Sequence, residues 1–251
     1  MHVTAIKTPR LFVNDNLLGV ISTTIPQSAL SERSVLVVTS KVVALWEGAV
    51  AEIPRTKEEK HKLIQSESQL YTKPTSSKYD LMLTVRDDVL GVNAGIDESN
   101  VAEGFVLLPE NSYQSAAHIW QFLRKQYGLR EVGVIITDSV SMPLRWGVVG
   151  RSLGHCGFKA IKSRIGEKDL FDREITMTQM AVSQALATAA VFEMGEVAES
   201  TPLCILTEIP HIEFQDAPPS KEEIDTYKIA LEDDVYAPLL MNARWQKGQK
   251  V

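Results

Sequence analysis

Short runs of apolar and β-branched residues, each bounded by polar or turn-forming residues, recur along the chain and predict buried strands. The most strongly β-branched run is Ser34–Val43, in which Lys41 is the single charged residue. The predicted strands are Val3–Val13, Ser34–Val43, Leu81–Val85, Val89–Val92, Phe105–Leu108, Val134–Thr137 and Leu203–Leu206.

Segments with helical spacing of apolar residues lie between these strands. Asn14-Asp15-Asn16 is a turn or cap before the first helix, and Ser112 is the expected cap of the third. The alanine-rich segment Ile175–Met194, capped by Thr176 or Thr178, is expected to be the longest helix. The predicted helices are Leu17–Ile25, Pro54–Tyr71, Tyr113–Tyr127 and Ile175–Met194.

The chain changes character from Glu208 onward, where prolines interrupt it and acidic residues accumulate. A chain of 251 residues with 44% hydrophobic residues can form one large domain or two intertwined ones. We therefore expect a main domain over residues 1–207 and an acidic, largely helical surface appendage over residues 208–251.

Composition and charge narrow the functional classes. The net charge of -6 argues against a protein that mainly binds nucleic acid through its phosphates. Two cysteines are too few for a disulfide framework or a thiolate zinc site, and they suit a reducing compartment. The N-terminus has no signal-peptide pattern and no apolar stretch reaches membrane-spanning length, so we expect a cytoplasmic protein that does not enter a membrane.

Polar side chains at the end of one apolar run are the first candidates for chemistry. Val134–Thr137 is followed directly by Asp138 and Ser139, and the loop after Val92 contains a second carboxylate, Asp97. Carboxylate and hydroxyl oxygens at the end of a strand are suitable ligands for a divalent cation. The alternative interpretation is that both segments are ordinary turns, in which the aspartates bind backbone amides.

Two further features have open interpretations. Lys41 either extends to the surface or reaches an anionic ligand at the end of its strand. Gly147, Gly150, Gly154 and Gly157 occur within eleven residues, which matches neither a P-loop nor a dinucleotide fingerprint. Such glycines allow close approach of the backbone to another backbone or to a phosphate.

Several segments, in their order along the chain, resemble the CofE-like family of gamma-glutamyl ligases that act on the deazaflavin coenzyme F420. The resemblance covers about residues 9 to 207, and an ordered series of motifs is more specific than any one of them. The segments are TSKVVALWEG (Thr39–Gly48), NAGIDESNV (Asn93–Val101), LLPENS (Leu107–Ser112), VGVIITDS (Val132–Ser139), PLRWGVVG (Pro143–Gly150), GFKAIKSRIGEKDLFDRE (Gly157–Glu174) and MGE (Met194–Glu196).

The resemblance implies an α+β fold with a mixed sheet and packed helices, assembled as an intertwined homodimer. It also implies a ligase that uses GTP (or ATP) and Mg or Mn to convert a carboxylate acceptor into an acyl phosphate, which the amine of L-glutamate then attacks. The metal ligands implied for this chain are Asp97, Asp138, Ser139 and Glu196.

The same resemblance implies roles for further positions. Catalytic roles fall on Asp138, Arg145 and Lys41, and nucleotide-binding roles fall on Asp15, Glu47, Gly48, Asn93, Gly147 and Lys159. Several cations of the family are replaced, at Phe12, Leu45, Ala49 and Met142. Charged contacts to phosphate are strong, so Lys41, Arg145, Arg151 and Lys159 are the expected substitutes. The alternative is a homodimer that has lost catalysis and binds a nucleotide or an anionic metabolite.

Overall fold

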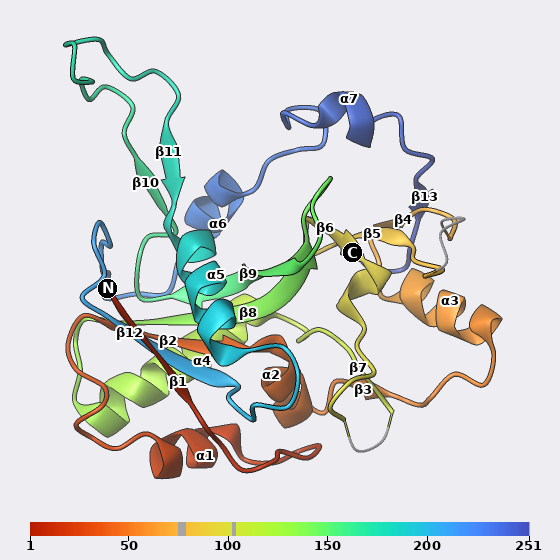
Figure 1. Ribbon diagram of the computed structural model, residues 1–251, viewed down its shortest axis with the longest axis horizontal. Helices are drawn as coiled ribbons and strands as arrows, with labels where there is room; N and C mark the ends of the chain where they lie inside the picture. Colours follow the sequence, from red (N-terminus) through yellow and green to blue (C-terminus); the bar gives the residue numbers. More distant parts are fainter. Residues whose placement is uncertain (75–78, 102–103, 251) are drawn as a thin grey trace.

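A computed structural model of the protein describes residues 1–74, 79–101 and 104–250 (Figure 1). The fold is α+β, as expected, and its largest sheet has five strands in the order β1-β12-β2-β8-β9. β2 and β8 run parallel, whereas the other neighbouring pairs are antiparallel, so the sheet is mixed. The strands are β1 (His2–Ile6), β2 (Ser34–Thr39), β8 (Val132–Ser141), β9 (Val148–Cys156) and β12 (Leu203–Thr207).

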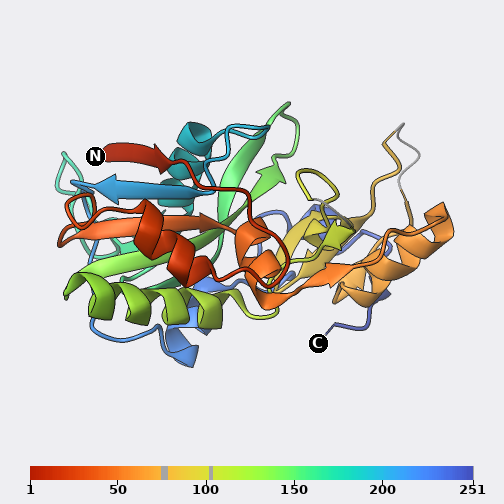
Figure 2. The same cartoon turned by 90° about the horizontal axis from the view of Figure 1, so that it is seen from below.

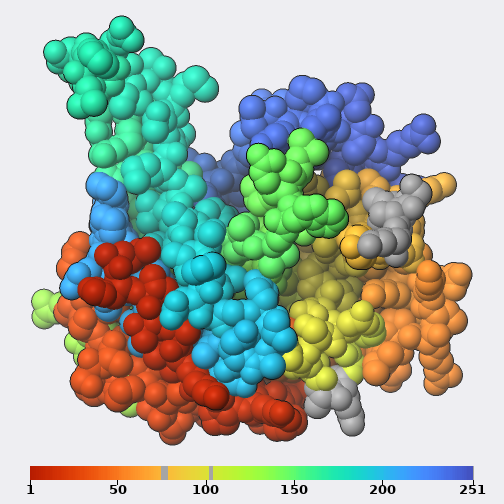
Figure 3. Space-filling view, in the orientation of Figure 1, coloured from red at the N-terminus to blue at the C-terminus, as the bar shows by residue number. Residues whose placement is uncertain are grey.

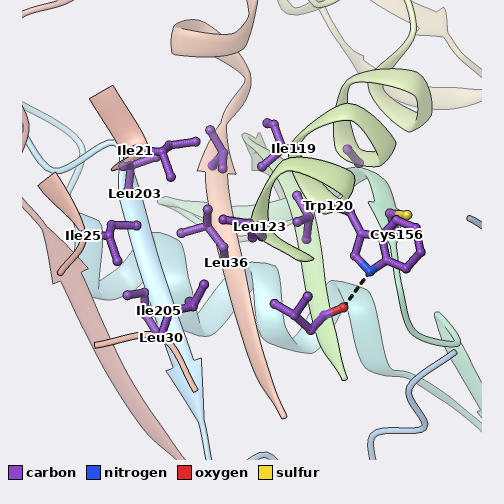
Figure 4. Packing of buried hydrophobic residues seen from close by; sticks show 14 of the residues in the cluster. Ile21, Ile25, Leu30, Leu36, Ile119, Trp120, Leu123, Cys156, Leu203 and Ile205 are labelled. Carbon is purple, nitrogen blue, oxygen red and sulfur yellow. Dashed lines mark hydrogen bonds between the residues drawn. The ribbon is translucent and has the colours of Figure 1, made fainter. Parts of the chain in front are cut away.

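Helices cover both faces of this sheet (Figure 2). Because side chains alternate along a strand, Leu36 and Val38 of β2 face α1 (Leu17–Thr24) and α4 (Ser112–Tyr127). Val35 and Val37 face α5 (Val182–Met194) on the other side. Figure 4 shows the α4 side, where the Trp120 indole donates a hydrogen bond of 2.9 Å to the Val132 carbonyl and anchors α4 to β8.

A second, smaller sheet lies beside the first, in the order β13-β4-β5-β6. The β5–β6 hairpin is present as predicted, with its turn at Asp87 and Asp88. The predicted helix over Pro54–Tyr71 is shorter and gives way to a strand at Leu70. The elements of this region are β3 (Val50–Ala51), α3 (Lys57–Ser66), β4 (Leu70–Tyr71), β5 (Leu83–Arg86), β6 (Val89–Val92), η1 (Asn93–Gly95) and β7 (Phe105–Val106).

The predicted strand Ser34–Val43 is wrong in its second half. β2 ends at Thr39, and α2 (Ser40–Glu47) begins at once, so Lys41 lies in the first turn of a helix. Val42, Val43, Ala44 and Leu45 are all buried in α2. A short run that is buried on every side has no diagnostic period, and this is why the run did not reveal the change from strand to helix.

The predicted helix Ile175–Met194 is also wrong at its start. Gln179–Ala181 forms β11, which pairs with β10 (Ile161–Ser163) as the base of an arm that projects from the molecule (Figures 1 and 3). α5 therefore begins at Val182, without a side-chain cap. At 13 residues it is shorter than α4, which has 16.

The glycines of β9 provide room for backbone packing, which is one of the two interpretations left open by the sequence. A Cβ atom at Gly150 would lie 2.3 Å from the Ala187 carbonyl oxygen of α5. At Gly154 it would lie 2.6 Å from the backbone of Ser112, at the start of α4. The two main helices thus approach β9 closely from both faces.

The segment after Thr207 runs along the molecule and joins both sheets. Glu213 and Gln215 exchange backbone hydrogen bonds with Lys159 and Gly157, just past β9. Further on, the tail pairs with β4 through its last strand. Its regular elements are α6 (Lys221–Tyr227), α7 (Ala237–Leu240) and β13 (Gln246–Lys247). In the part of the chain that the structure describes, we find no helix with the length and apolar character needed to cross a membrane.

Candidate active site at the carboxyl ends of β2 and β8

The pairing of the parallel strands β2 and β8 ends at Thr39 and Thr137, where β2 stops and β8 continues to Ser141 paired with β9. Carboxyl ends of parallel strands meet at one edge of a sheet, which is where ligands bind in many such sheets. From β2 the chain enters α2 through Ser40 and Lys41, and β8 continues through Asp138 and Ser139. Polar residues that are far apart in the sequence, those after β2 and those in the last part of β8, therefore lie close together at this edge of the sheet.

Asp138 is held by two donors. The Ser40 hydroxyl donates to its Oδ1 atom at 3.1 Å, and Arg151 Nη2 contacts its Oδ2 atom at 3.1 Å. The expected end of the strand before Asp138 is wrong, because β8 runs to Ser141. A register shift between Ile136 and Thr137 marks a bulge just before Asp138. A bulge changes the direction of the side chains while the strands stay paired. The polar residues Asp138 and Ser139 can therefore belong to the strand and do not form a turn.

Ser139 points to the opposite face of the sheet from Asp138, because neighbouring residues of a strand alternate. Its hydroxyl contacts both carboxylate oxygens of Glu196, at 2.8 and 3.0 Å. Glu196 follows the end of α5, on the face that this helix covers. The two candidate ligands of β8 thus have different partners.

Asp97 forms an ion pair with Lys41. The Lys41 ammonium lies 2.8 Å from Asp97 Oδ2 and donates to the Ser99 carbonyl at 2.8 Å. The Ser99 amide donates to Asp97 Oδ1 at 2.7 Å. Burial raises the pKa of Asp97, but the contacts from Lys41 and Ser99 outweigh it and leave the pKa below its ordinary value. Lys41 thus reaches an anion at the end of the strand, and that anion is a side chain of this protein.

These contacts close into a ring. The side-chain amide of Asn100 donates to the Val197 carbonyl at 2.6 Å, so the loop of Asp97 touches the segment of Glu196. Glu196 contacts Ser139, the neighbour of Asp138, and Asp138 contacts Ser40, the neighbour of Lys41. The predicted residues Lys41, Asp97, Asp138, Ser139 and Glu196 therefore surround one edge of the sheet. We call this set the edge ring.

The donor chemistry of the edge ring suits a hard cation, since carboxylate and hydroxyl oxygens are the ligands that Mg²⁺ and Mn²⁺ prefer. In residues 1–74, 79–101 and 104–250, no three acidic, histidine or cysteine side chains are grouped closely enough to hold a metal ion. Each carboxylate of the edge ring is instead paired with a lysine, an arginine or a hydroxyl. A cation bound here would have to compete with those partners.

Three predicted nucleotide-binding residues meet at the end of α2. Gly48 ends this helix with φ +71°, and a Cβ atom there would lie 2.9 Å from Asn14 Oδ1. Asp15 accepts a hydrogen bond from the Phe12 amide at 2.7 Å and shapes the turn before α1. Glu47 accepts one from the Glu110 amide at 3.2 Å and one from the Ser115 hydroxyl. In this structure all three contact other parts of the protein.

The remaining predicted residues are spread more widely. Asn93 is the first residue of η1, and its side-chain oxygen accepts a hydrogen bond from the Met82 amide at 3.0 Å. Arg145 and Gly147 lie on the exposed tip between β8 and β9. Lys159 follows the far end of β9 and pairs with Glu213, which raises the pKa of the Lys159 ammonium. It lies at the opposite end of the sheet from Asp138, because Cys156 pairs with Val134 at the start of β8.

Sequence reasoning missed the contributions of Ser40, Ser99 and Asn100. Ser40 carried a signal, since Thr39-Ser40 is typical of a helix start after a strand. Ser99 contributes through its backbone carbonyl and amide, and the Asn100 side chain contacts a backbone carbonyl far along the chain, so their residue types alone did not point to these contacts.

The model of the family described as F420-0:Gamma-glutamyl ligase matches residues 5–208, which include the entire edge ring. The chain belongs to this gamma-glutamyl ligase family. The tail after residue 208 lies outside the matched region.

Curated members of the gamma-glutamyl ligase family are similar over different lengths. Proteins named coenzyme F420:L-glutamate ligase from Methanosarcina barkeri and Methanosarcina mazei are both 32% identical to this chain. These matches cover 79% and 80% of this chain, and 81% and 82% of the relatives. A protein of the same name from Methanocaldococcus jannaschii is 46% identical over 114 residues, a segment that spans 45% of either chain. This chain thus spans about half the length of some relatives it matches and most of others.

Proposed function

We propose that the protein is a nucleoside-triphosphate- and metal-dependent ligase that joins L-glutamate, or a similar amino acid, to a carboxylate acceptor through an amide bond. The observation that carries this proposal is the edge ring, which lies wholly within the region shared with gamma-glutamyl ligases. We take GTP as the first candidate for the triphosphate and ATP as the second.

In the proposed reaction a carboxylate oxygen of the acceptor attacks the γ-phosphorus of the triphosphate, and the nucleoside diphosphate leaves. The glutamate nitrogen then attacks the acyl carbon, inorganic phosphate leaves and the nitrogen loses a proton, which completes the amide. A divalent cation, when bound, would neutralise the charge that gathers on the phosphate oxygens. Of the residues that the resemblance implies as ligands, Asp97 and Asp138 are the ones that would hold it, because Ser139 and Glu196 meet on the opposite face of the sheet from Asp138.

Lys41 is the residue of the edge ring best suited to contact phosphate. Its side chain is 23% exposed and lies in the first turn of α2, where the helix dipole also favours an anion. In the described contacts it neutralises Asp97, so a cation bound at Asp97 would free the Lys41 ammonium for the triphosphate. The exchange leaves the Asp97 carboxylate paired with a cation and pairs the Lys41 ammonium with phosphate.

A homodimer is part of the same proposal. Leu144 and Trp146, on the tip between β8 and β9, are 95% and 94% exposed, and Leu170 at the end of the arm is 98% exposed. Large apolar side chains grouped on a projecting tip and arm are typical of an interaction surface. The tip starts three residues after Ser139, so a second copy seated on it would lie close to the edge ring.

Incubation with each triphosphate, L-glutamate, Mn²⁺ or Mg²⁺ and a panel of carboxylate acceptors tests the proposed activity. We expect inorganic phosphate and an acceptor heavier by one glutamyl group in the mass spectrum. Asp138→Asn should lower the rate by at least ~100-fold while the protein stays folded, because it removes a charged cation ligand. Absence of turnover with every combination, or an unchanged rate in Asp138→Asn, would contradict the proposal.

Thermal unfolding separates the ligase from the alternative binding module. A triphosphate that stabilises the protein only together with metal supports the ligase. Stabilisation without metal and without turnover would indicate a member of the family that has kept binding and lost catalysis.

A further inference from the structure

Arg151 is the buried cation next to the edge ring. It lies on β9 directly opposite Asp138 and is only 7% exposed. Its guanidinium divides its donors between the two sheets: Nη2 lies 3.1 Å from Asp138 Oδ2, and Nη1 donates to the Leu90 carbonyl of β6 at 3.2 Å. Nε has no hydrogen-bond partner in the part of the chain that the structure describes.

The backbone of β6 at Gly91 packs against this guanidinium and fixes its plane. A Cβ atom at Gly91 would lie 3.0 Å from Arg151 Nη1 and 3.7 Å from its Cζ atom, so the group lies directly against β6. The planar fork of arginine reaches two acceptors in fixed directions, whereas a lysine ammonium is a single point of charge. Only arginine can therefore contact Asp138 and Leu90 together in this geometry.

This arrangement is costly if its purpose is stability alone. Removing a guanidinium from water costs about as much free energy as its ion pair gains, and apolar residues of similar volume often serve stability as well. Asp138 is partly exposed, with 23% of its side chain accessible, so its pairing adds little through burial. The geometry is better explained by what it does to the Asp138 carboxylate.

We propose that Arg151 is a positioning residue that fixes the direction of the Asp138 carboxylate for binding a divalent cation. Arg151 contacts Oδ2 and the Ser40 hydroxyl donates to Oδ1. With both oxygens held, the carboxylate cannot rotate freely, and its remaining lone pairs keep one fixed direction in which a cation can bind. The β5–β6 hairpin supports this orientation through Leu90 and Gly91. The role rests on the proposed function, since it assumes that the edge ring binds a metal.

The test is titration of the full chain with Mn²⁺ alone, followed by electron paramagnetic resonance of the free and the bound ion. Arg151→Lys keeps the charge and loses the fork, so we expect Mn²⁺ to bind at least ~10-fold more weakly and with an altered bound spectrum. Gly91→Ala keeps the arginine and displaces its guanidinium by a few tenths of an ångström, and should weaken binding about 3-fold. Arg124→Lys, which changes an arginine paired with Asp216 away from the edge ring, is the matched control and should bind as the wild type does.

The outcomes distinguish this role from the function on which it rests. A wild-type chain that binds no Mn²⁺ would overturn both. A wild type that binds Mn²⁺, lost in Asp138→Asn but unchanged in affinity and spectrum in Arg151→Lys and Gly91→Ala, would overturn the positioning role alone. If Arg151→Lys does not fold, Gly91→Ala decides, because it leaves the charge in place.

Discussion

At the scale of single residues, each charged group of the edge ring already has an ionic or hydrogen-bonding partner. Lys41 neutralises Asp97, Arg151 neutralises Asp138, and the Ser139 hydroxyl contacts Glu196. The sequence identified the three acids and Lys41 through ordered motifs, because those motifs are local. It did not show which cation faces which acid, since that depends on how β9 and the loop of Asp97 fold back onto the edge.

The Lys41–Asp97 pair leads to a pH-dependent prediction. Since the pKa of Asp97 lies below its ordinary value of 3.8, the pair stabilises the fold above that pH, and the stabilisation is lost as the pH falls through the lowered pKa. In Lys41→Met, burial acts without the lysine, so the pKa of Asp97 should rise. Nuclear magnetic resonance titration of the Asp97 carboxyl measures the change.

The control for this titration is Lys60→Ala, which removes a neighbouring surface pair with Glu98 and should leave Asp97 unchanged. An identical pKa of Asp97 in wild type and Lys41→Met would show that the pair does not act as described.

His155 leads to a second prediction, away from the edge ring. It is 2% exposed among Tyr113, Phe158 and Tyr227, and burial lowers the pKa of the imidazole to about 4. An unfolded histidine binds its proton near pH 6.5, so stability should fall as the pH drops from about 6.5 to 4, by up to about 3 kcal/mol. Urea unfolding at several pH values in this range measures the loss.

His155→Phe keeps an aromatic ring and removes the titration, so its free energy of unfolding should depend less on pH in this range. A slope equal to that of the wild type would assign the pH dependence to other groups.

At the scale of elements, the sequence predicted β1, β2, β8 and β12 of the large sheet and the helices α1, α3, α4 and α5. It missed β9, whose glycines hid a strand pattern, and it misplaced boundaries where burial is complete. The run Ser34–Val43 is apolar throughout, yet Thr39 ends a strand and Ser40 begins a helix. The prediction of a helix over the residues before α5 was wrong for a different reason. Gln179–Ala181 pairs with Ile161–Ser163, and a pairing across that distance leaves no local signal.

Gly154 leads to a prediction about how α4 packs on β9. Its φ lies outside the left-handed region, so alanine meets no backbone strain there, and the obstacle is the backbone of Ser112 and Tyr113 at 2.6 to 2.8 Å. We expect Gly154→Ala to lower the free energy of unfolding by about 1–3 kcal/mol, because neither backbone can move easily. Chemical denaturation measures this loss.

Val148→Ala, at the exposed start of the same strand, is the control and should change stability by less than about 0.5 kcal/mol. Equal effects at both positions would mean that strand propensity, and not close packing, decides the result.

At the scale of the whole molecule, the tail connects two sheets that the sequence pattern did not relate to each other. Lys228 pairs with Asp88 in the turn between β5 and β6, and β13 extends the smaller sheet next to β4. Lys250 contacts Glu110 at 2.8 Å, close to the start of α4. The acidic composition predicted a surface position, whereas these contacts depend on scattered lysines and backbone pairing.

Removal of residues 244–251 tests this connection, since it deletes β13 and Lys250. The amides of β4 and of the β5–β6 hairpin should then exchange with deuterium at least ~10-fold faster, while those of β2 and β8 keep their protection. Hydrogen exchange followed by mass spectrometry resolves the two regions.

Lys247→Ala keeps the backbone pairing of β13 and should exchange as the wild type does. Equal acceleration in both sheets after truncation would indicate that they unfold together whether or not the tail joins them.

The contact between the tail and the end of β9 has a consequence for self-association. β9 is the outer strand of the large sheet, and an uncovered outer strand is a template on which another chain can add a strand and aggregate. Glu213 and Gln215 already occupy backbone groups of Lys159 and Gly157, and Tyr227 packs on His155. These contacts lie at and just beyond the last residues of β9, so a segment outside the family match covers that end of the outer strand, and its deletion should raise the tendency of the protein to aggregate.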